Sequence, residues 1–351
     1  MKHTTYFFFV IFTCIFSLSA NASNSNNERG HRKSVFNSFA NETLIKITLE
    51  TDIDALIDNK FKDEYQTALI KYTDDNDHLK ERKIKVKARG KYRNRVCDFP
   101  PLKIKFSKDE LTSEGLSDLN KLKLVSHCFD TEDGSVPEQL MKEFLAYKTY
   151  NILSENSYQV KLALVTYKNL KTNVSFEQYA FLIESTEELA ERIGRYQRKM
   201  YSLQRHELNK EEFGLLNVFQ FMIGNKDWDL VSSKNLKAFP SFDNKEILLV
   251  PYDFDFAGFV DASYAALHPE QKQEGIRDRL CSEKFTDSAS LESVLSRVEE
   301  KKVLILNMIE DFEYLDKGDK KDATSYIHAF YKLIENRKKA KDVFLYKPSD
   351  L

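Results

Sequence analysis

The sequence predicts an α+β fold with two lobes, and the distribution of two kinds of pattern supports this prediction. Short runs in which apolar and polar residues alternate fill much of the chain from residue 43 to about residue 185, as the strands of an antiparallel sheet require. One long helical pattern interrupts these runs, and from residue 186 onward the helical period dominates. We therefore expect a sheet-rich N-terminal lobe with one long helix over residues 43–185 and a helical C-terminal lobe over residues 186–351.

Seven stretches of the first lobe have the alternation of strands. Five precede the long helix and two follow it: TLIKITLE, YQTALIKY, RKIKVKARGKYR, PLKIKF, KLKLVSH, YQVKLALVTYKN and EQYAFLIES. In the third stretch, Ile84, Val86 and Ala88 should face the core, while the basic side chains between them face solvent. The long helix is expected in SVPEQLMKEFLAYKTYNILSEN, because its apolar residues recur at helical spacing after a proline.

Helical periodicity marks four segments of the second lobe. They are TEELAERIGRYQ, KEEFGLLNVFQFMIGN, SLESVLSRVEEKKVLILNMIEDF and YIHAFYKLIENRKKA. Between the second and the third lies one short strand hairpin, NLKAF followed by EILLVPYDFDF. The second lobe is therefore expected to be helical around a single hairpin.

The N-terminus predicts export. Residues 1–22 combine a lysine, an apolar run that is short for a membrane span and the small-residue pattern Ala20-Asn21-Ala22, which together indicate a signal peptide cleaved after Ala22. An uncleaved membrane anchor is the alternative. Residues 23–42 are polar and without period, and predict a flexible leader. The mature protein is expected in the periplasm, at the cell surface or outside the cell, without stable membrane insertion.

Removal of residues 1–22 affects the charge and the cysteines. The formal net charge changes from −2 to −3 with the loss of Lys2, and a near-neutral chain is not a general nucleic-acid binder. Three cysteines remain: Cys97, Cys128 and Cys281. A Cys97–Cys128 disulfide is possible in an oxidising compartment, and two isolated core thiols are the alternative.

Two sets of acidic residues lie beside apolar runs near the start of the second lobe. The first is GNKDWDLVSSKN, with Asp227, Asp229 and Asn235, and the second is VPYDFDFAG, with Asp253 and Asp255. Carboxylates are rarely buried unless something compensates them, so two such sets in one neighbourhood predict a cation or a reacting hydroxyl. A polar loop and a polar hairpin end are the alternatives.

A sheet-rich lobe followed by a helical lobe is the bilobal layout of the protein-kinase fold. The two acidic sets fall where such a fold keeps its catalytic loop and its metal-binding Asp. Phosphoryl transfer needs one carboxylate to take or orient the proton of the attacking hydroxyl. It also needs an amide and a second carboxylate to hold the divalent ions that neutralise the phosphates. The predicted fold class is therefore a bilobal, protein-kinase-like α+β fold.

Four stretches together resemble the spore-coat protein H (CotH) kinase-like family, a distant relative of the HipA-like and protein kinases. In order, they are ARGKYRNRVCDFPPLKIKF, LMKEFLAYKTYNIL, GNKDWDLVSSKN and VPYDFDFAG. The resemblance implies an exported atypical kinase that uses ATP with Mg²⁺ or Mn²⁺ to phosphorylate Ser or Thr of other exported proteins.

The resemblance also implies roles for individual residues. Asp227 would be the catalytic Asp, Asn235 the metal-binding Asn and Asp253 the metal-binding Asp, with Asp255 as the rival of Asp253. Asn235 follows Asp227 by eight residues, a longer spacing than in the catalytic-loop motif of protein kinases. Two residues of the loop therefore compete for the role of Asn235: Asp229 and Ser232.

Basic residues of the first lobe are expected to hold the phosphates. Residues 80–95 include nine basic residues and one acidic residue, and no G-x-G-x-x-G loop occurs, so arginines of this run would replace backbone amides. A lysine of the next strand would hold the α- and β-phosphates, with a glutamate of the long helix as its ion-pair partner. The expected residues are Arg89 and Arg93, Lys103 or Lys105, and Glu143. A solvated strand face and an exposed helix glutamate are the alternatives.

Other functions fit parts of the pattern. A binding or adhesion protein on a degenerate kinase fold would explain the missing glycine loop and the long Asp-to-Asn spacing. A nucleotidyl transferase would keep the same fold and cofactor. A glycosidase with Asp227 and Asp253 as its carboxylate pair lacks a sugar-binding aromatic platform. No H-E-x-x-H, G-x-S-x-G or C-x-x-C pattern points to a zinc protease, a serine hydrolase or a thioredoxin.

Overall fold

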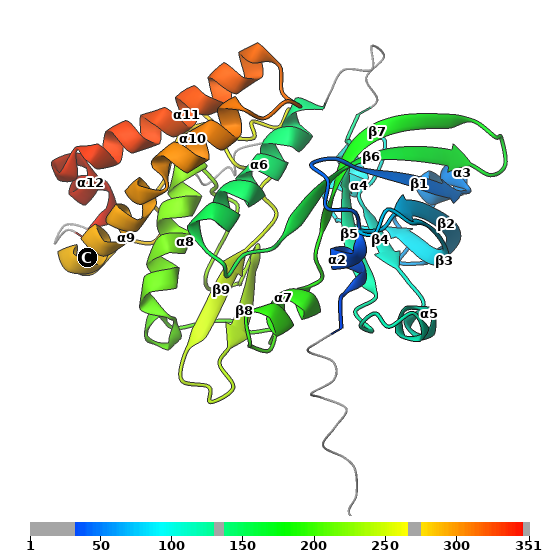
Figure 1. Cartoon of the computed structure of the whole chain (residues 1–351). Helices are drawn as coiled ribbons and strands as arrows, with labels where there is room; N and C mark the ends of the chain where they lie inside the picture. The colour runs from blue at the N-terminus through cyan, green and yellow to red at the C-terminus, as the bar shows by residue number, and fades with distance from the viewer. Residues whose placement is uncertain (1–31, 130–136, 266–274, 347–351) are drawn as a thin grey trace, which may run out of the picture. The chain divides into compact units, whose positions relative to one another are not determined.

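The computed structural model describes residues 32–129, 137–265 and 275–346 (Figure 1). Residues Lys33–Leu351 form one compact unit. The predicted signal peptide, residues 1–22, lies outside the described residues.

Seven strands close into a barrel in the order β1-β2-β3-β4-β5-β7-β6. Adjacent strands are antiparallel except β1 and β6, which run parallel. The strands are β1 Ile45–Thr51, β2 Gln66–Thr73, β3 Leu79–Ala88, β4 Leu102–Lys105, β5 Lys121–Ser126, β6 Val160–Asn169 and β7 Ser175–Ile183. Short helices decorate the first part of the chain: α2 Val35–Ser38, α3 Ile53–Asp58, α4 Arg93–Val96 and α5 Lys108–Ser113.

The predicted fold class, a bilobal protein-kinase-like α+β fold with an antiparallel sheet in its first lobe, is wrong. Strand β6 pairs in parallel with β1, from Ile45 opposite Ala163 to Thr51 opposite Asn169, and so closes a mixed barrel. Alternation in a sequence shows which segments are strands and which face is buried, but it does not specify which strands meet at the edges of a sheet. The architecture is a closed barrel with most of the helices later in the chain.

Alternation predicts the barrel core correctly where one strand face is exposed. Ile84, Val86 and Ala88 of β3 are buried as expected. Strands β6 and β7 differ, because both of their faces are buried over part of their length. Val165 belongs to the core inside the barrel, whereas Phe181 belongs to a second core that the barrel shares with the helices.

Helix α6 (Glu138–Leu153) connects the barrel to the later helices. It contacts β6 and β7 on one side and α10 on the other, and it lies between the barrel and the helical layer in Figure 1. The later helices are α7 Thr186–Arg192, the 3₁₀ turn η1 Arg205–Glu207, α8 Lys210–Met222, α9 Ser288–Glu300, α10 Lys302–Glu310, α11 Lys317–Glu335 and α12 Arg337–Phe344. Two segments predicted as single helices are each divided, at Lys301 and at Asn336.

A separate antiparallel hairpin carries the two acidic sets. Its strands, β8 (Leu236–Pro240) and β9 (Ile247–Pro251), pair with Leu236 opposite Pro251. Asn235 immediately precedes β8, and Tyr252 immediately follows β9. The backbone N–H of Tyr252 donates to the carbonyl of Asn235 at 3.1 Å. The register of this hairpin therefore brings the end of the first acidic set next to the start of the second.

The end of the predicted leader differs from a flexible segment. Val35, Phe36 and Phe39 are buried in the barrel core, because they offer the apolar side chains that a docked segment needs. Glu188 of α7 is also buried, and accepts hydrogen bonds from the hydroxyl of Ser34 and, at 3.1 Å, from the side-chain amide of Asn37.

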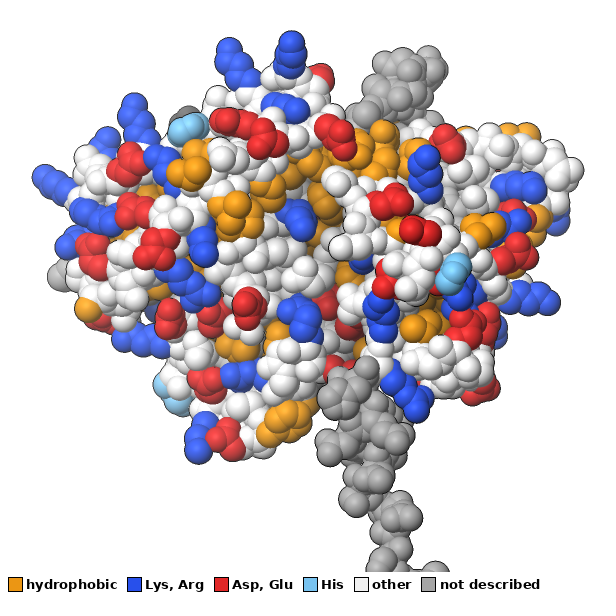
Figure 2. Space-filling view, viewed as in Figure 1, with side chains coloured by type: hydrophobic (Ala, Val, Ile, Leu, Met, Phe, Trp, Pro, Cys, Tyr) orange, Lys and Arg blue, Asp and Glu red, His pale blue; other side chains and the backbone are white. Residues whose placement is uncertain are grey.

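Within residues 32–129, 137–265 and 275–346, no helix has both the length and the apolar composition that crossing a bilayer requires. Basic and acidic side chains of the described residues are interspersed over the face seen in Figure 2, so the charge of this face is mixed in sign.

We expect Glu188 to make stability depend on pH. Burial raises the pKa of Glu188 to about 7, from a usual value of 4.5. The stability that its neutral form provides is present below pH 4.5 and is lost as the pH rises towards 7. Glu188→Gln should remove this loss, which is at most about 3 kcal/mol. Urea unfolding between pH 4.5 and 8 measures this loss, with Glu187→Gln, an exposed position on α7, as the control. Equal pH slopes in the wild type and Glu188→Gln would contradict the prediction.

Candidate active site

The loop after α8 holds Asp227 in a fixed position. Gly224 begins the loop at φ +64°, and a Cβ atom there would lie 2.1 Å from the Tyr326 hydroxyl oxygen, so the turn requires glycine. Asn225 is fully buried. Its side-chain amide donates to the Gln220 side-chain oxygen at 3.0 Å, and its own oxygen accepts the N–H of Asp227 at 2.9 Å. Asp227 therefore emerges from a rigid, buried anchor.

The long spacing between Asp227 and Asn235 is taken up by a small hairpin. The backbones of Asp229 and Lys234 pair through N–H···O bonds of 3.2 and 3.0 Å, so the residues between them loop out. The Asn235 side-chain amide then donates to the Asp227 Oδ2 atom at 2.8 Å and to the Asp227 carbonyl at 2.7 Å. Lys234 forms an ion pair with the same carboxylate. The structure thus brings the first two predicted site residues into direct contact.

The two rivals of Asn235 are used within the small hairpin itself. The N–H of Ser232 donates to the Asp229 Oδ1 atom at 2.6 Å, and both residues are exposed. This is an Asx-type turn, in which the carboxylate satisfies its own backbone. Asn235 is therefore the loop residue that faces Asp227.

Asp253 is held between two helices. It adopts φ +68°, and its N–H donates to the Tyr147 hydroxyl of α6 at 2.9 Å. The next residue, Phe254, is fully buried, with ring centroids 4.6 Å from Tyr147 and 5.4 Å from Phe219 of α8. An unusual backbone conformation at a partly exposed carboxylate is thus supported by firm packing on both sides.

Asp255 lies in a different environment from Asp253. It is 5 % exposed, and its Oδ2 atom accepts the Tyr264 hydroxyl at 3.1 Å. Burial, followed by the charge of Asp253, raises the pKa of Asp255 to about 7. Asp253 is the partly exposed acid of the two, and Asp255 belongs to a buried cluster behind it.

A cavity lined with lysines lies beside these acids. Its volume is ≈ 180 Å³, and its lining residues are Lys103, Lys121, Leu122, Lys123, Ser185, Thr186, Glu187, Gln197 and Lys237. Lys103 and Lys123 are direct neighbours across the antiparallel pair of β4 and β5. Four lysines and one glutamate, Glu187, which is paired with Lys121 at 3.7 Å, line the cavity. Because the basic side chains outnumber the acidic one, an anionic ligand is the natural occupant.

Lys123 connects the cavity to the acidic sets. Its Nζ atom lies 4.9 Å from the ring centroid of Tyr158 and 5.3 Å from that of Tyr252. Burial, together with the positive charges of Arg89, Lys237 and Lys103, lowers the pKa of Lys123 to about 7, and the charge of Asp253 opposes this shift. A lysine that is surrounded by cations and rings and attracted by one carboxylate is well placed to receive phosphate oxygens.

The other predicted phosphate-binding residues divide into two groups. Lys103 lines the cavity, and the charge of Arg89 acts on Lys123. Lys105 does not line it; its Nζ atom lies 5.8 Å from the ring centroid of Tyr65. Glu143 also differs from expectation, because its partner is Arg93, at 3.4 Å, instead of a lysine of β4.

Sequence reasoning missed Lys123. It lies in the stretch KLKLVSH, which the alternation identifies as a strand, and that strand is the last before the helix that carries Glu143. A signal was therefore present in the order of elements. This signal does not single out Lys123, because Lys103 and Lys105 have the same alternation and lie closer to the arginine-rich run.

A divalent ion at this site would find few protein donor groups. Within the described ranges, no three His, Cys, Asp or Glu side chains are grouped so as to hold a metal ion by themselves. Mg²⁺ does not require such a group, because it usually takes one or two carboxylates and completes its shell with phosphate oxygens and water. Asp253 is partly exposed, and the register of the β8–β9 hairpin brings Asn235 next to Tyr252, which precedes Asp253 in the chain. Asp253 and the Asn235 amide therefore fit an ion that arrives with a nucleotide.

Comparison with known proteins adds a weak structural likeness. Neither protein-family models nor curated proteins match the chain. Among solved structures, the chain is similar to the crystal structure of a Helicobacter pylori proinflammatory kinase, CtkA, with 12% sequence identity and a TM-score of 0.37 over 69% of this chain and 90% of that chain. A likeness of this strength is too weak to assign a function, which must rest on the residues.

We expect ATP binding to depend on the protonation of Lys123. The neutral form, which prevails above pH 7, must take up a proton to meet a phosphate, so ATP affinity should fall as the pH rises from 7 to 9, by up to about tenfold per pH unit. Lys123→Met should weaken binding at pH 7 by roughly tenfold or more and abolish the pH dependence. Titration calorimetry at constant magnesium measures both. Lys83→Met, an exposed lysine of β3, is the control. A wild-type affinity that is constant up to pH 9 would refute the role of Lys123.

Proposed function

We propose that this protein is an ATP-dependent phosphotransferase that acts on a hydroxyl group. One observation carries the proposal: the lysine-lined cavity, the Asp227–Asn235 pair and Asp253 lie in one neighbourhood. Tyr252, the residue before Asp253, joins them: the Nζ atoms of Lys123 and Lys237 lie 5.3 and 5.0 Å from its ring centroid, and its N–H donates to the Asn235 carbonyl. Phosphoryl transfer depends mainly on positioning and charge stabilisation, and these are the groups that it needs.

Each group has a role in this proposal. Lys123, with Lys103, holds the phosphates in the cavity. Asp227 orients the acceptor hydroxyl and accepts the proton of that hydroxyl. Asn235 and Lys234 hold the Asp227 carboxylate in position. Asp253 and Asn235 would hold Mg²⁺ or Mn²⁺, which neutralises charge on the phosphates.

The substrate and the compartment form the finer part of the proposal. We infer that the acceptor is Ser or Thr of an exported protein and that the chain is a CotH-like kinase, as its four motifs suggest. The Cys97–Cys128 disulfide supports an oxidising compartment, because disulfides persist there and are rare in a reducing cytosol. The periplasm, the cell surface and the medium all satisfy this condition.

A nucleotidyl transferase is the second candidate. The same cavity and acids would hold ATP, but the acceptor would attack the α-phosphorus, and the label on the product would differ. A protein that binds a ligand without catalysing a reaction is the third candidate function.

We expect ATP with Mg²⁺ or Mn²⁺ to raise the melting temperature of the mature protein, because a ligand that binds only the folded state stabilises it. At a concentration of about 100 times Kd the gain is ~2.7 kcal/mol. Transfer of radiolabel from γ-labelled but not α-labelled ATP to a generic protein acceptor supports the kinase. Transfer from α-labelled ATP supports the nucleotidyl transferase. No melting shift at millimolar ATP and metal would exclude both.

Two substitutions should separate the acids. Asp227→Ala should lower phosphoryl transfer by about 100-fold or more and leave metal-dependent ATP binding largely unchanged, because Asp227 acts on the acceptor. Asp253→Ala should lose both transfer and metal-dependent binding. Asp229→Ala, in the exposed hairpin of the same loop, is the matched control and should retain both. If Asp255→Ala loses metal-dependent binding while Asp253→Ala keeps it, the metal ligand is Asp255.

A further inference from the structure

A disulfide ties the turn that carries Arg93 to the end of β5. Cys97 follows α4, and Cys128 follows β5. The N–H of Cys97 donates to the Arg93 carbonyl at 2.9 Å, and the N–H of Asp98 donates to the Cys128 carbonyl at 2.9 Å. The turn is therefore fastened to the barrel by one covalent bond and by a few hydrogen bonds.

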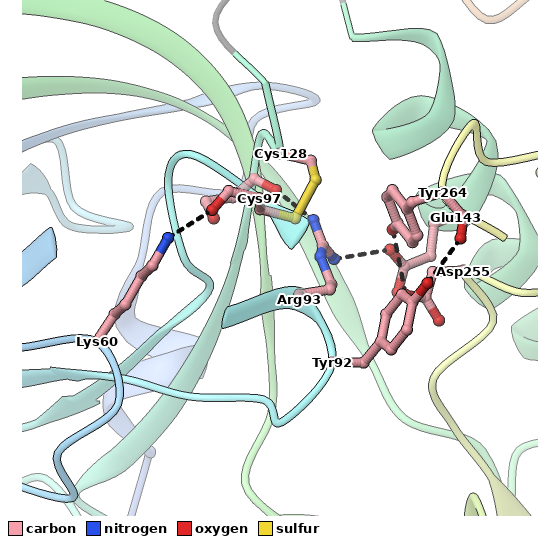
Figure 3. The surroundings of a disulfide bond; sticks show 9 residues. Lys60, Tyr92, Arg93, Cys97, Cys128, Glu143, Asp255 and Tyr264 are labelled. Atoms are coloured by element: carbon pink, nitrogen blue, oxygen red, sulfur yellow. Dashed lines mark hydrogen bonds and ion pairs between the residues drawn. A yellow bond between two sulfur atoms is a disulfide. The ribbon is translucent and has the colours of Figure 1, made fainter. Parts of the chain in front are cut away.

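Arg93 reaches from this turn to the buried Glu143, and Asp255 lies in the same cluster, as Figure 3 shows. Its guanidinium is buried, donates to the Ser126 carbonyl at 2.7 Å and lies 3.4 Å from the Glu143 carboxylate. Glu143 and Asp255 are 3 % and 5 % exposed. Two buried carboxylates in one cluster repel each other and need a compensating cation, and Arg93 provides it.

The same turn also contacts the segment that follows Asp253. The Tyr92 hydroxyl donates to the Tyr264 carbonyl at 3.0 Å, and the Tyr92 ring lies 5.1 Å from the Phe256 ring. Tyr264 in turn donates its hydroxyl to Asp255. Residues 92–97 thus form a clamp on the chain between Asp253 and Tyr264, and the clamp is attached to β5, the strand of Lys123.

We propose that Arg93 is a positioning residue for the Asp253 segment and that the Cys97–Cys128 disulfide holds it in place, so that the activity requires this cysteine pair to be oxidised. The activity part of this inference rests on the proposed function. In the oxidised protein, Arg93 compensates Glu143 and Asp255, and the segment stays packed.

Reduction would release the clamp. A dithiol such as dithiothreitol supplies two electrons and two protons, converts the disulfide to two thiols and itself becomes a cyclic disulfide. The turn then keeps only hydrogen bonds, so Arg93 leaves the buried acids more often. The segment from Asp253 to Tyr264 loses the support of the turn and moves more, although the hydrogen bond to Tyr147 and the lysine-lined cavity, neither of which includes a residue of the turn, remain.

The test compares the mature chain with and without dithiothreitol, in wild type, Cys97→Ser/Cys128→Ser and Arg93→Gln. Reduction, the double serine variant and Arg93→Gln should each lower kcat by roughly ten- to a hundred-fold, because a small misplacement of a catalytic group has effects of this size. The KM for metal-bound ATP should rise as well, because Asp253 belongs to the displaced segment, whereas ATP binding without the ion, which depends on the lysine-lined cavity, should change by less than about twofold. Reducing the disulfide in the Arg93→Gln variant should cause no further loss of kcat, because the disulfide acts through Arg93.

Three controls separate positioning from general destabilisation. Arg82→Gln removes another buried arginine, paired with Glu114 instead of the site acids, and should retain kcat. Cys281→Ser removes the free cysteine and should remain sensitive to dithiothreitol. Arg93→Lys keeps the positive charge and should recover part of the kcat lost in Arg93→Gln.

A second readout does not depend on phosphoryl transfer. Amide hydrogen exchange in residues 253–264 should accelerate on reduction and in Arg93→Gln, but not in Arg82→Gln. If the oxidised wild type transfers no phosphoryl group, the proposed function fails, and this exchange pattern still decides whether the clamp exists. Exchange that is unchanged by reduction, or an equal further loss of kcat when Arg93→Gln is reduced, would overturn the inference.

Discussion

The parallel pairing of β1 with β6 closes the barrel, and the position of the candidate site depends on this closure. Once β6 and β7 are fixed in the wall of the barrel, their outer faces carry apolar residues such as Phe181 that must be covered. Helix α6 covers them. Through the Tyr147 hydroxyl the same helix holds the backbone of Asp253, and through Glu143 it meets Arg93. A backbone pairing in the barrel thereby fixes a carboxylate that belongs to a distant part of the sequence.

The second structural requirement is the register of β8 and β9. Because Leu236 lies opposite Pro251, Asn235 and Tyr252 are adjacent, and the two acidic sets meet although sixteen residues separate Asn235 from Tyr252. A slip of one residue would turn the hairpin's side chains to the opposite face and separate the sets. The small hairpin between Asp229 and Lys234 also brings distant residues together. It loops out the intervening residues, so that the Asn235 side chain reaches Asp227.

Charge is distributed unevenly across the site. Lysines surround the cavity on one side, and Glu143, Asp255 and Asp253 gather on the other, with Arg93 among them. Burial raises the pKa of Glu143 to about 8, and Arg93 opposes that rise. Burial with neighbouring cations lowers the pKa of Lys123 to about 7. Several groups therefore change charge near neutral pH, a combination that is frequent at functional sites and uncommon on ordinary surfaces.

The sequence alone indicated the positions of the strands, of helix α6 and of the β8–β9 hairpin, because each has a local apolar period that survives in the fold. The buried side chains of β3 followed from the same alternation. The two acidic sets were also visible, because carboxylates next to apolar runs are unusual. These features depend on residues that are neighbours in the chain.

Tertiary structure decided what depends on distant residues. Closure of the sheet requires β1 to recognise β6 across more than a hundred residues, and local alternation carries no information about that choice. The pairing of Cys97 with Cys128, the partner of Glu143 and the place of Lys123 also depend on which strands become neighbours. Many strands of this chain carry alternating lysines, so the sequence could not single out the one that faces the cavity. Only the packing of β5 beside β4 and β7, opposite Asp253, gives Lys123 an environment different from the others, because burial and nearby charges arise from the folded arrangement.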